Sequence, residues 1–497
     1  MSIFEKPRTY IDSWLQALTM KKILAITTLA IAALMLTPMG IGPVTSLFNF
    51  NYSPSLQYVQ FGSLTTLPQG LPLCKSASLG NIVCYSPAFI KKAYEYPSTL
   101  DGSGQTIVIV DAFGSPGIAS DLATFDGVFG IPAPASFTIF CGNSATPFDT
   151  STCPTVNFNS HNAFHDQIGW SVETTLDVEY AHAMAPGANI VLDVASSSSG
   201  NAINAAETSA IAAFPGAVFS QSFGIPEIFL MGNNGQISQA QTNYANGVAV
   251  GDTFLASAGD TGADFGTGTA QANFPESSPY NTGVTGTMGL PYNATGTLQP
   301  CPTSTPFSCT SGLSAYHGPC VLGRTVPPNC VPDGYHGEQV WNEPQFGAAT
   351  GGAQSLIFGV PSYQAGLGLT ARGPDVDYNA AVDGGVLVVN SAITGGTPAL
   401  FIVGGTSAGS PQWAGIIALV NQARANLGKG LIGGNLNPTL YSIYHSSRYS
   451  TDFHDITVGN DIVSGSTVGY SAGTGYDLAS GIGTPIVDQL IVDLAAA

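Results

Sequence analysis

One pattern recurs between residues 104 and 262: a short apolar run, a turn that contains glycine, and a longer stretch between runs. The apolar runs are GQTIVIVDAFG (104–114), APGANIVLDVA (185–195), AVFSQSFG (217–224) and TFLASAGDTG (253–262). Continuous apolar runs of this length are typical of parallel strands buried on both faces. The stretches 168–184, 202–214 and 236–246 are predicted to be helices. The alternation predicts an α/β fold, with a predominantly parallel sheet and helices on both faces.

Polar residues stand where several of these strands are expected to end. Asp111, Ser222 and Asp260 follow three of the runs, and Ser407 follows another apolar run, FIV, nearer the C-terminus. Active sites in such sheets lie beyond the carboxyl ends of the strands. We therefore expect these side chains to converge.

Ser407 lies in the stretch VGGTSAGSPQWAG (403–415), which is predicted to turn from a strand into a helix. Gly404 and Gly405 permit a tight bend, and Pro411 suits a first helical turn, where its missing N–H is not needed. A serine at this junction exposes its hydroxyl, and its own N–H is free to meet developing negative charge. A glycine-rich turn that merely contains serine is the alternative, so the rest of the chain must supply a base.

A serine hydroxyl is a poor nucleophile near neutral pH and needs a base. None of the seven histidines lies in an HGT-type turn. Glu173 and Asp177, by contrast, are spaced i,i+4, which places both on one face of a helix. Two such carboxylates ordinarily lie on a solvated face of a helix. This helix is largely apolar and aromatic, so we expect the pair to be buried, and burial disfavours the charged form of a carboxyl group. We predict that Glu173 takes the proton of Ser407 and that Asp177 orients Glu173.

Several stretches together resemble the sedolisin, or serine-carboxyl peptidase, family. They are GTSAGSP, ETTLDVEYAHAMAPGANI, SAGDTGADFG, NFPESSPYNTGVTGT, VWNE and the tail DI…GTGYD. The resemblance runs from about Ser86 to the C-terminus. It implies a subtilisin-like fold, in agreement with the alternation of strands and helices.

The resemblance also implies a role for each matched residue. Ser407 matches the nucleophile, Glu173 the general base and acid, Asp177 the carboxylate behind it, and Asp260 the oxyanion-hole aspartate. Asp260 must be protonated to donate a hydrogen bond to the oxyanion, so an acidic working range is expected. The implied activity is that of a secreted endopeptidase that cleaves proteins and peptides through an acyl-enzyme on Ser407.

The C-terminal tail matches the family's calcium loop, which implies one structural Ca²⁺. Its matched ligand positions are Asp455, Ile456, Gly473, Gly475 and Asp477, with Ile456 contributing its carbonyl. Calcium prefers oxygen ligands, and glycines allow backbone carbonyls to turn inward. The ion is expected to brace the last turn and the sheet edge and not to contact substrate.

The charge of the chain excludes one large class of partners. Twelve basic and thirty-one acidic residues give a net charge of −19, and no Lys or Arg occurs between Lys92 and Arg324. Such a surface repels phosphate backbones, so we expect no nucleic-acid partner. It suits acidic surroundings, because the carboxylates become neutral there and few cations remain to repel one another.

The N-terminus predicts export. Lys21 and Lys22 precede an apolar run over 23–36, as in a signal peptide. We expect membrane association only if this apolar segment is not cleaved off and stays as an anchor. Eight cysteines fit an exported chain, and we expect sequential disulfides. The expected pairs are Cys74–Cys84, Cys141–Cys153, Cys301–Cys309 and Cys320–Cys330.

These features predict three parts of the chain. Residues 1–42 form an extension with the signal peptide, 43–85 a short segment, and 86–497 the peptidase domain. Within that domain, 288–345 is expected to be a disulfide-stapled surface insertion, because it is rich in Pro, Thr and Ser and holds four cysteines. We expect a monomer.

Two other functions remain open from the residues alone. The sequence GTSAG also fits the G-x-S-x-G elbow of α/β-hydrolases, which indicates a secreted esterase. That fold needs an acid and then a histidine after the serine, and His454 adjoins Asp455, which the calcium loop claims. A non-catalytic surface protein explains the composition and the cysteines, but not the four catalytic-type positions.

Overall fold

The larger sheet has eight strands, and the polar residues discussed above lie at one end of it. The computed structural model describes residues 51–54, 56–62, 73–76, 80–142, 164–232, 234–289, 307–309, 330–332, 335 and 337–497. All of them belong to one unit, Asn49–Ala497. The signal peptide expected within 1–42 lies outside the described residues.

The strand order of this sheet is β14-β11-β9-β7-β4-β6-β5, and β17 also pairs with β11. Every pairing is parallel except that of β14 with β11. Its strands are β4 (Thr106–Ala112), β5 (Ser136–Phe140), β6 (Asn189–Ala195), β7 (Val218–Gln221), β9 (Thr253–Ser257), β11 (Asn281–Met288), β14 (Gln339–Val340) and β17 (Val376–Asn379). The predicted α/β fold with a predominantly parallel sheet is confirmed.

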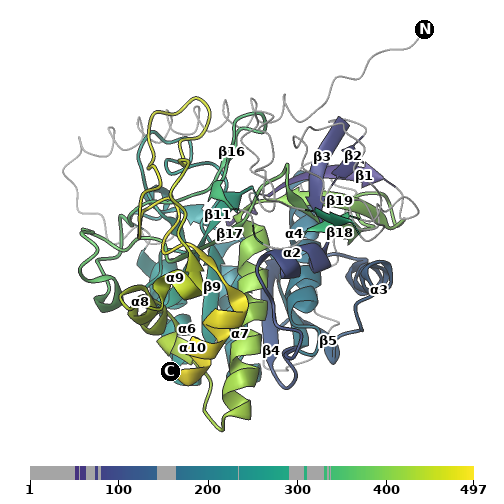
Figure 1. Cartoon of the computed structure of the whole chain (residues 1–497), viewed down its shortest axis with the longest axis horizontal. Coiled ribbons are helices and arrows are strands. Elements are labelled where there is room, and N and C mark those ends of the chain that lie inside the picture. Colours follow the sequence, from purple (N-terminus) through teal and green to yellow (C-terminus); the bar gives the residue numbers. More distant parts are fainter. Residues whose placement is uncertain are drawn as a thin grey trace, which may run out of the picture. The chain divides into compact units, whose positions relative to one another are not determined.

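Helices cover both faces of this sheet (Figure 1). The main ones are α3 (Ile118–Phe129), α4 (Phe164–Met184), α5 (Gly200–Ala213), α6 (Asn234–Ala249), α7 (Gly409–Asn426) and α10 (Val487–Ala496). Alternate residues of β4 point to opposite faces. Ile107 and Ile109 pack with residues of α3, α4, α7 and α10, whereas Val108 and Val110 pack with residues of α5 and α6.

A second sheet has five strands in the order β1-β19-β18-β3-β2. They are β1 (Gln57–Gly62), β2 (Leu73–Ser76), β3 (Gly80–Tyr85), β18 (Gly385–Asn390) and β19 (Ala399–Gly404). β1 runs antiparallel to β19, with Gln57 opposite Gly404. The expected short segment 43–85 thus supplies three strands to a sheet whose other two strands come from near the C-terminus.

The remaining elements are short and connect or flank the two sheets. They are α2 (Pro87–Ala93), α8 (Leu436–Tyr444), α9 (Tyr449–Asp452), β8 (Ile225–Pro226), β10 (Asn273–Phe274), β12 (Phe307–Cys309), β13 (Cys330–Pro332), β15 (Asn342–Glu343), β16 (Ala348–Ala349), β20 (Phe453–His454), β21 (Thr484–Pro485) and the 3₁₀ turns η3 (Glu227–Phe229), η4 (Ser362–Gln364), η5 (Thr406–Ala408) and η6 (Gly433–Asn435).

The insertion expected at 288–345 is described only in part. Its hairpin β12–β13 places Cys309 opposite Cys330, whereas the expected pairs were Cys301–Cys309 and Cys320–Cys330. The disulfides of this segment lie outside the described side chains and stay a prediction. The end of the segment is not a surface excursion, because β14 joins the main sheet and Trp341 is fully buried.

Two cysteines outside that segment are described in the disulfide-bonded state, Cys84 and Cys141. The residues expected to pair with them, Cys74 and Cys153, lie outside the described side chains. Their sequential pairing therefore also stays a prediction.

Candidate active site

Ser407 lies between the end of β19 and the start of α7, as the sequence predicts. Gly405 makes the bend with φ of 134°, η5 follows, and α7 begins at Gly409. A Cβ at Gly405 would lie 2.3 Å from Oδ2 of Asp260, so both the backbone angle and the space require glycine. The bend therefore presses the Ser407 turn against Asp260.

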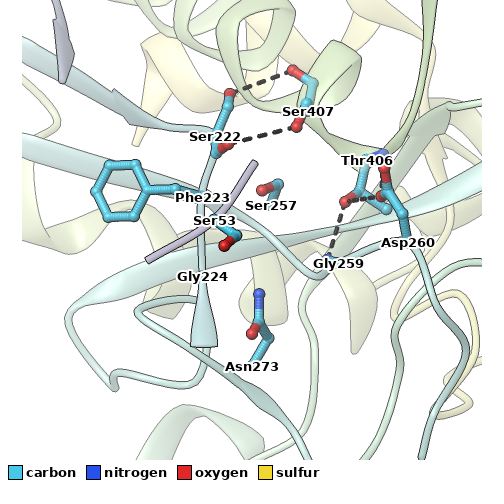
Figure 2. A pocket seen from close by; sticks show the side chains of 10 residues that line it. All are labelled: Ser53, Ser222, Phe223, Gly224, Ser257, Gly259, Asp260, Asn273, Thr406 and Ser407. Carbon is cyan, nitrogen blue, oxygen red and sulfur yellow. Dashed lines mark hydrogen bonds between the residues drawn. The ribbon is translucent and has the colours of Figure 1, made fainter. Parts of the chain in front are cut away.

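Ser407 and Ser222 are joined by two hydrogen bonds (Figure 2). The Ser407 hydroxyl donates to the Ser222 carbonyl at 3.4 Å, and the Ser222 hydroxyl donates to the Ser407 carbonyl at 3.2 Å. Ser222 directly follows β7. The predicted convergence of strand ends thus holds for this pair.

Glu173 and Asp177 project from α4 and are fully buried. Burial raises the pKa of Glu173 well above its usual range, and the charges of Asp177 and Asp111 raise it further, while Ser407 acts in the opposite direction by hydrogen bonding. The Glu173 oxygens nonetheless have no partner at full hydrogen-bond geometry among the described residues. The Ser407 hydroxyl instead donates to the Ser222 carbonyl, and hydrogen bonds between catalytic groups often tighten only when substrate binds.

Asp111, at the end of β4, is the third carboxylate of this cluster. It is fully buried, and burial raises its pKa well above its usual range. Neither of its carboxyl oxygens has a hydrogen-bond partner among the described residues. Its charge also raises the pKa of Asp177, after the larger effect of burial. The sequence predicts that Asp111 converges with the site, and the resemblance to the family implies no role for it. Three carboxylates this close in a buried site cannot all be ionised, so they must share protons.

Asp260 follows β9 and faces the Ser407 turn from the other side (Figure 2). The Thr406 N–H and the Thr406 hydroxyl both donate to its Oδ1, each at 2.8 Å, and its Oδ2 has no partner among the described residues. Burial raises the pKa of Asp260 to about 7, although the two bonds from Thr406 lower it. Because Oδ1 already accepts two bonds, the proton of the neutral acid belongs on Oδ2.

Ser407, Ser222 and Asp260 line a small pocket, and the three buried carboxylates Glu173, Asp177 and Asp111 are not among its lining residues. Its lining residues are Ser53, Ser222, Phe223, Gly224, Ser257, Gly259, Asp260, Asn273, Thr406 and Ser407. None of the histidines with a described side chain lines it: His182 pairs with Asp126, His445 packs on Tyr444, and His454 stacks on Tyr335. The α/β-hydrolase alternative therefore lacks its base in the described part of the chain.

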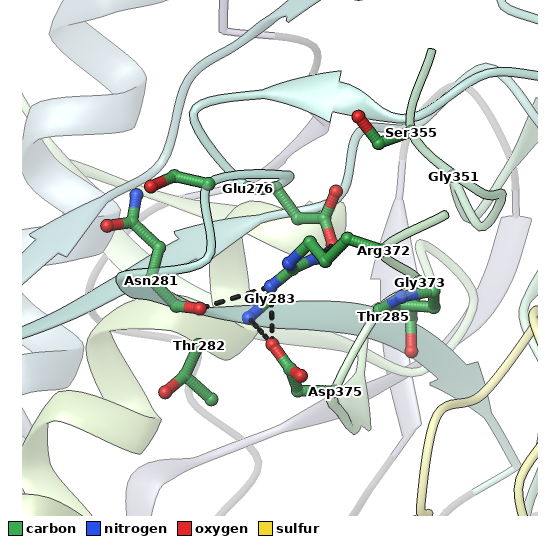
Figure 3. Close-up of polar contacts among 12 residues, drawn as sticks. Glu276, Asn281, Thr282, Gly283, Thr285, Gly351, Ser355, Arg372, Gly373 and Asp375 are labelled. Carbon is green, nitrogen blue, oxygen red and sulfur yellow. Dashed lines mark hydrogen bonds and ion pairs between the residues drawn. The ribbon is translucent and has the colours of Figure 1, made fainter. Parts of the chain in front are cut away.

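The loop beside Asp260 is fixed by a buried ion cluster (Figure 3). Arg372 is fully buried and pairs with Glu276 at 2.7 Å and with Asp375, whose Oδ2 also accepts the Gly283 N–H of β11. Upstream in the same loop, the Gly351 N–H donates to the Gly259 carbonyl at 2.6 Å. The cluster thus ties Arg372 and Asp375 to β11, and the Gly351 bond separately ties the start of this segment to the turn after β9 that carries Asp260.

The residues expected to bind calcium lie together in the C-terminal loop. The Gly475 N–H donates to both oxygens of Asp455, at 3.1 and 2.9 Å, and the Gly473 N–H donates to Asp477 at 2.9 Å. Ile456, next to Asp455, is buried. No group of three His, Cys, Asp or Glu in the described ranges is arranged to hold a metal. A cation here would therefore need backbone carbonyls beside the two carboxylates, a donor set that suits Ca²⁺.

Comparison of the sequence and the fold with known proteins identifies the family of this chain. The solved structure of Pseudomonas sedolisin, a serine-carboxyl proteinase complexed with two molecules of pseudo-iodotyrostatin, has the same fold, with a TM-score of 0.62 at 23% identity over 84% of this chain and 99% of that one. Kumamolisin from Bacillus sp. (strain MN-32) is 30% identical over 420 residues, which are 82% of this chain and 63% of kumamolisin. The chain belongs to the sedolisin family.

Other sedolisin-family proteins match shorter parts of the chain. Sedolisin of Pseudomonas sp. (strain 101) is 32% identical over 164 residues, which are 31% of this chain and 25% of that protein. Xanthomonalisin of Xanthomonas sp. (strain T-22) is 30% identical over 263 residues, or 50% of this chain and 28% of that protein. The chain thus spans less than two thirds of the length of these curated relatives. No family model matches the sequence.

Proposed function

We propose that this sedolisin-family chain is a serine-carboxyl endopeptidase that hydrolyses peptide bonds at acidic pH. The observation that carries the proposal is the convergence of Ser407, a buried carboxylate pair on α4 and a buried aspartate with one unpartnered oxygen. Serine supplies the nucleophile, the pair moves its proton, and the aspartate receives the negative charge that develops on the substrate.

The reaction follows from where each proton is held. Oγ of Ser407 attacks the carbonyl carbon of the substrate while its proton passes to ionised Glu173, which Asp177 orients. The carbonyl oxygen becomes an oxyanion and accepts hydrogen bonds from protonated Oδ2 of Asp260 and from the Ser407 N–H. Glu173 then returns the proton to the leaving amine, which leaves an acyl-enzyme on Ser407. A water molecule then attacks this ester while Glu173 takes its proton. The bond between the acyl carbon and Oγ of Ser407 breaks, Glu173 gives the proton to that Oγ, and the second product leaves as an acid.

The proposed pH range rests on two opposite requirements. Asp260 must be protonated to donate, and with a pKa of about 7 it carries its proton below neutrality. Glu173 must be ionised to act as a base. Activity is therefore expected to fall again at a pH low enough to keep Glu173 protonated. Proton sharing with Asp177 and Asp111 allows one negative charge to remain in the cluster.

Digestion of casein and haemoglobin between pH 2 and 8 tests this function, with Ser407→Ala and Glu173→Gln beside the wild type. We expect hydrolysis by the wild type in the acidic range alone. Removal of the nucleophile or the base should lower kcat by at least roughly 10³-fold. Full proteolysis by Ser407→Ala at pH 3–4, or sustained activity above neutral pH with a loss below pH 5, would refute the mechanism.

We also propose one structural Ca²⁺ held by Asp455 and Asp477, the Ile456 carbonyl and the loop of Gly473 and Gly475. The support is that both carboxylates already hold that loop. Such an ion would join Asp455 and Ile456 to the loop that contains Gly473, Gly475 and Asp477, and it would take no part in the reaction. Secretion through the N-terminal signal segment and a monomeric state complete the proposal. Within the described ranges, no helix is both long and apolar enough to cross a lipid bilayer.

A further inference from the structure

The side chain of Thr406 lies between the Ser407 turn and the turn that follows β9 (Figure 2). It is buried, and its hydroxyl has two hydrogen-bond partners. The Gly259 N–H donates to Oγ1 of Thr406 at 2.9 Å, and the same Oγ1 lies 2.8 Å from Oδ1 of Asp260. The hydroxyl thus contacts both Asp260 and the residue directly before it.

These two contacts fix the direction of the hydroxyl hydrogen. A backbone N–H can only donate, so Gly259 uses Oγ1 of Thr406 as an acceptor. The single hydrogen of the hydroxyl has one acceptor among the described residues, and that acceptor is Oδ1 of Asp260. The Thr406 N–H donates to the same Oδ1 at 2.8 Å. Two donors therefore point at Oδ1 whether Asp260 is ionised or neutral.

The direction of these donors matters because a neutral carboxyl group can carry its proton on either oxygen. A proton on Oδ1 of Asp260 would meet the hydrogens of Thr406 head-on. A proton on Oδ2 meets no such conflict, because Oδ2 has no partner among the described residues. Only this second arrangement leaves the proton free to be donated to a bound substrate.

The methyl group of Thr406 holds the hydroxyl in this orientation. A Cβ on Gly286 of β11 would lie 3.2 Å from Cγ2 of Thr406 and 2.7 Å from Cβ of Ala380, so little space remains around the methyl group. A β-branched side chain is also stiff about its first torsion. Valine therefore fits the shape of this site without the hydroxyl, and serine keeps the hydroxyl without the methyl group.

We propose that Thr406 is a positioning residue whose hydroxyl confines the acid proton of Asp260 to Oδ2, the oxygen that donates to the oxyanion. The proposal rests on the peptidase function proposed above. Burial raises the pKa of Asp260, and the bonds from Thr406 lower it, so loss of the hydroxyl raises this pKa further. Among the described groups, the charge of Asp260 also acts on Glu173 of α4, where burial is the larger effect.

The first test compares Thr406→Val with Thr406→Ser in the full chain, with kcat and KM for a short peptide measured between pH 2 and 8. We expect Thr406→Val to lower kcat by about 10–10²-fold, with KM within about twofold of the wild type. Its alkaline limb should move to higher pH by about half a unit or more, because Asp260 holds its proton longer. Thr406→Ser should restore kcat to within about threefold and return the limb to its wild-type position.

Two outcomes of this comparison would overturn the proposal. One is a wild-type profile in Thr406→Val, and the other is an equal loss in Thr406→Ser, which would assign the effect to packing. If Thr406→Val does not fold, Thr406→Cys replaces it, because a thiol is only a weak donor. The same shift of the alkaline limb is then expected.

The second test needs no catalysis. The carboxyl group of Asp260 is titrated by infrared difference spectroscopy in the Ser407→Ala variant, and its band is identified by its loss in Ser407→Ala, Asp260→Asn. Adding Thr406→Val should raise the titration midpoint, and adding Thr406→Ser should leave it unchanged. Equal midpoints with Thr406 and with valine would show that the hydroxyl does not donate to Asp260. Absence of proteolysis in the wild type refutes the proposed function instead, and the infrared result stands independently of it.

Discussion

Asp260 shows how one carboxyl group is oriented for the hydrogen bond that we propose it donates to the oxyanion. Oδ1 takes both bonds from Thr406, and Gly405 leaves room for Oδ2, which has no partner among the described residues. Which oxygen of Asp260 accepts hydrogen bonds and which has no partner does not follow from the SAGD sequence, because this depends on a bend 145 positions later. The sequence predicted the residue but not the orientation of its carboxyl group.

Replacing Asp260 by asparagine should separate hydrogen bonding from titration. An amide keeps a donor but cannot ionise, so the loss of activity near pH 7, where Asp260 gives up its proton, should move to higher pH. Asp260→Ala has no donor and should lower kcat by about 10²–10³-fold. The measurement is kcat/KM against pH. Asp264→Asn, on the same loop but outside the pocket lining, is the control and should leave the profile unchanged.

Asp111 should tune the base without touching substrate. Its charge contributes to the raised pKa of Glu173, after burial and Asp177, so Asp111→Asn should lower that pKa. The acidic limb of the kcat profile should then move to lower pH, with maximal kcat within about tenfold of the wild type. Asp193→Asn is the matched control, because Asp193 is equally buried on β6 but is not among the groups that shift Glu173. Identical profiles for both variants would contradict this role.

At the scale of elements, the Ser407 bend joins the second sheet to the helix beneath the first. β19 lies between β1 and β18, and α7 packs along α4, the helix that carries Glu173 and Asp177. The position of Ser407 relative to Glu173 is therefore set by helix packing and not by local sequence.

Gly405→Ala tests that bend. The change forces an unfavourable φ and brings Cβ within 2.3 Å of Asp260. We expect the free energy of unfolding to fall by about 2–3 kcal/mol and activity to fall more than roughly 10²-fold. Denaturant unfolding and a peptide assay measure both effects. Gly430→Ala has open space around it and should be neutral, and equal behaviour of the two variants would rule out the steric argument.

Sequence patterns predicted the elements whose burial is continuous and missed those that depend on distant partners. The strands β4, β6, β7 and β9 coincide with the four apolar runs. β1, with the sequence QYVQFG, carries no such signal, because its partner β19 lies more than 300 residues away. The backbone pairing of Asn51 with Ser199 and of Ser53 with Gly224 was missed for the same reason, because such pairing depends on tertiary position and leaves little trace in side-chain pattern.

At the scale of the whole molecule, buried acids outnumber buried bases among the residues that the structure describes. Burial raises the pKa of Glu207 and Asp461 to about 8, and that of Asp252 and Glu343 to about 7. In each case the folded state holds its proton to a higher pH than the unfolded chain, whose carboxyls titrate near about 4. The folded state therefore binds more protons between about pH 4 and 8, and stability must fall as pH rises through that window.

Thermal unfolding should show this directly. We expect Tm to be highest near pH 4 and to fall steadily toward pH 8. Glu207→Gln, which keeps an oxygen for the bond from Gln221, should reduce the slope by removing one titrating group. A Tm that rises from pH 4 to pH 7 would show that these acids are not protonated in the folded state.

Removal of calcium should also lower stability if the C-terminal loop binds it. A chelator should reduce Tm of the wild type by several degrees, and Asp477→Ala should abolish that response. Asp477 lies far in sequence from Ser407 but holds the turn of Gly473, Ala479 and Ser480 through its carboxylate. The same chelator effect in the wild type and in Asp477→Ala would place the ion elsewhere.

The catalytic groups are spread along the chain in a way that affects its synthesis. Asp111, Glu173, Asp260 and Ser407 come from four separate parts of a 497-residue chain, and the serine comes last. A growing chain on the ribosome lacks its nucleophile until more than four fifths of it has been made, and it lacks α7, which positions that nucleophile, for longer still. Under the proposed mechanism, unfinished chains that end before Ser407 therefore have no nucleophile and are inert.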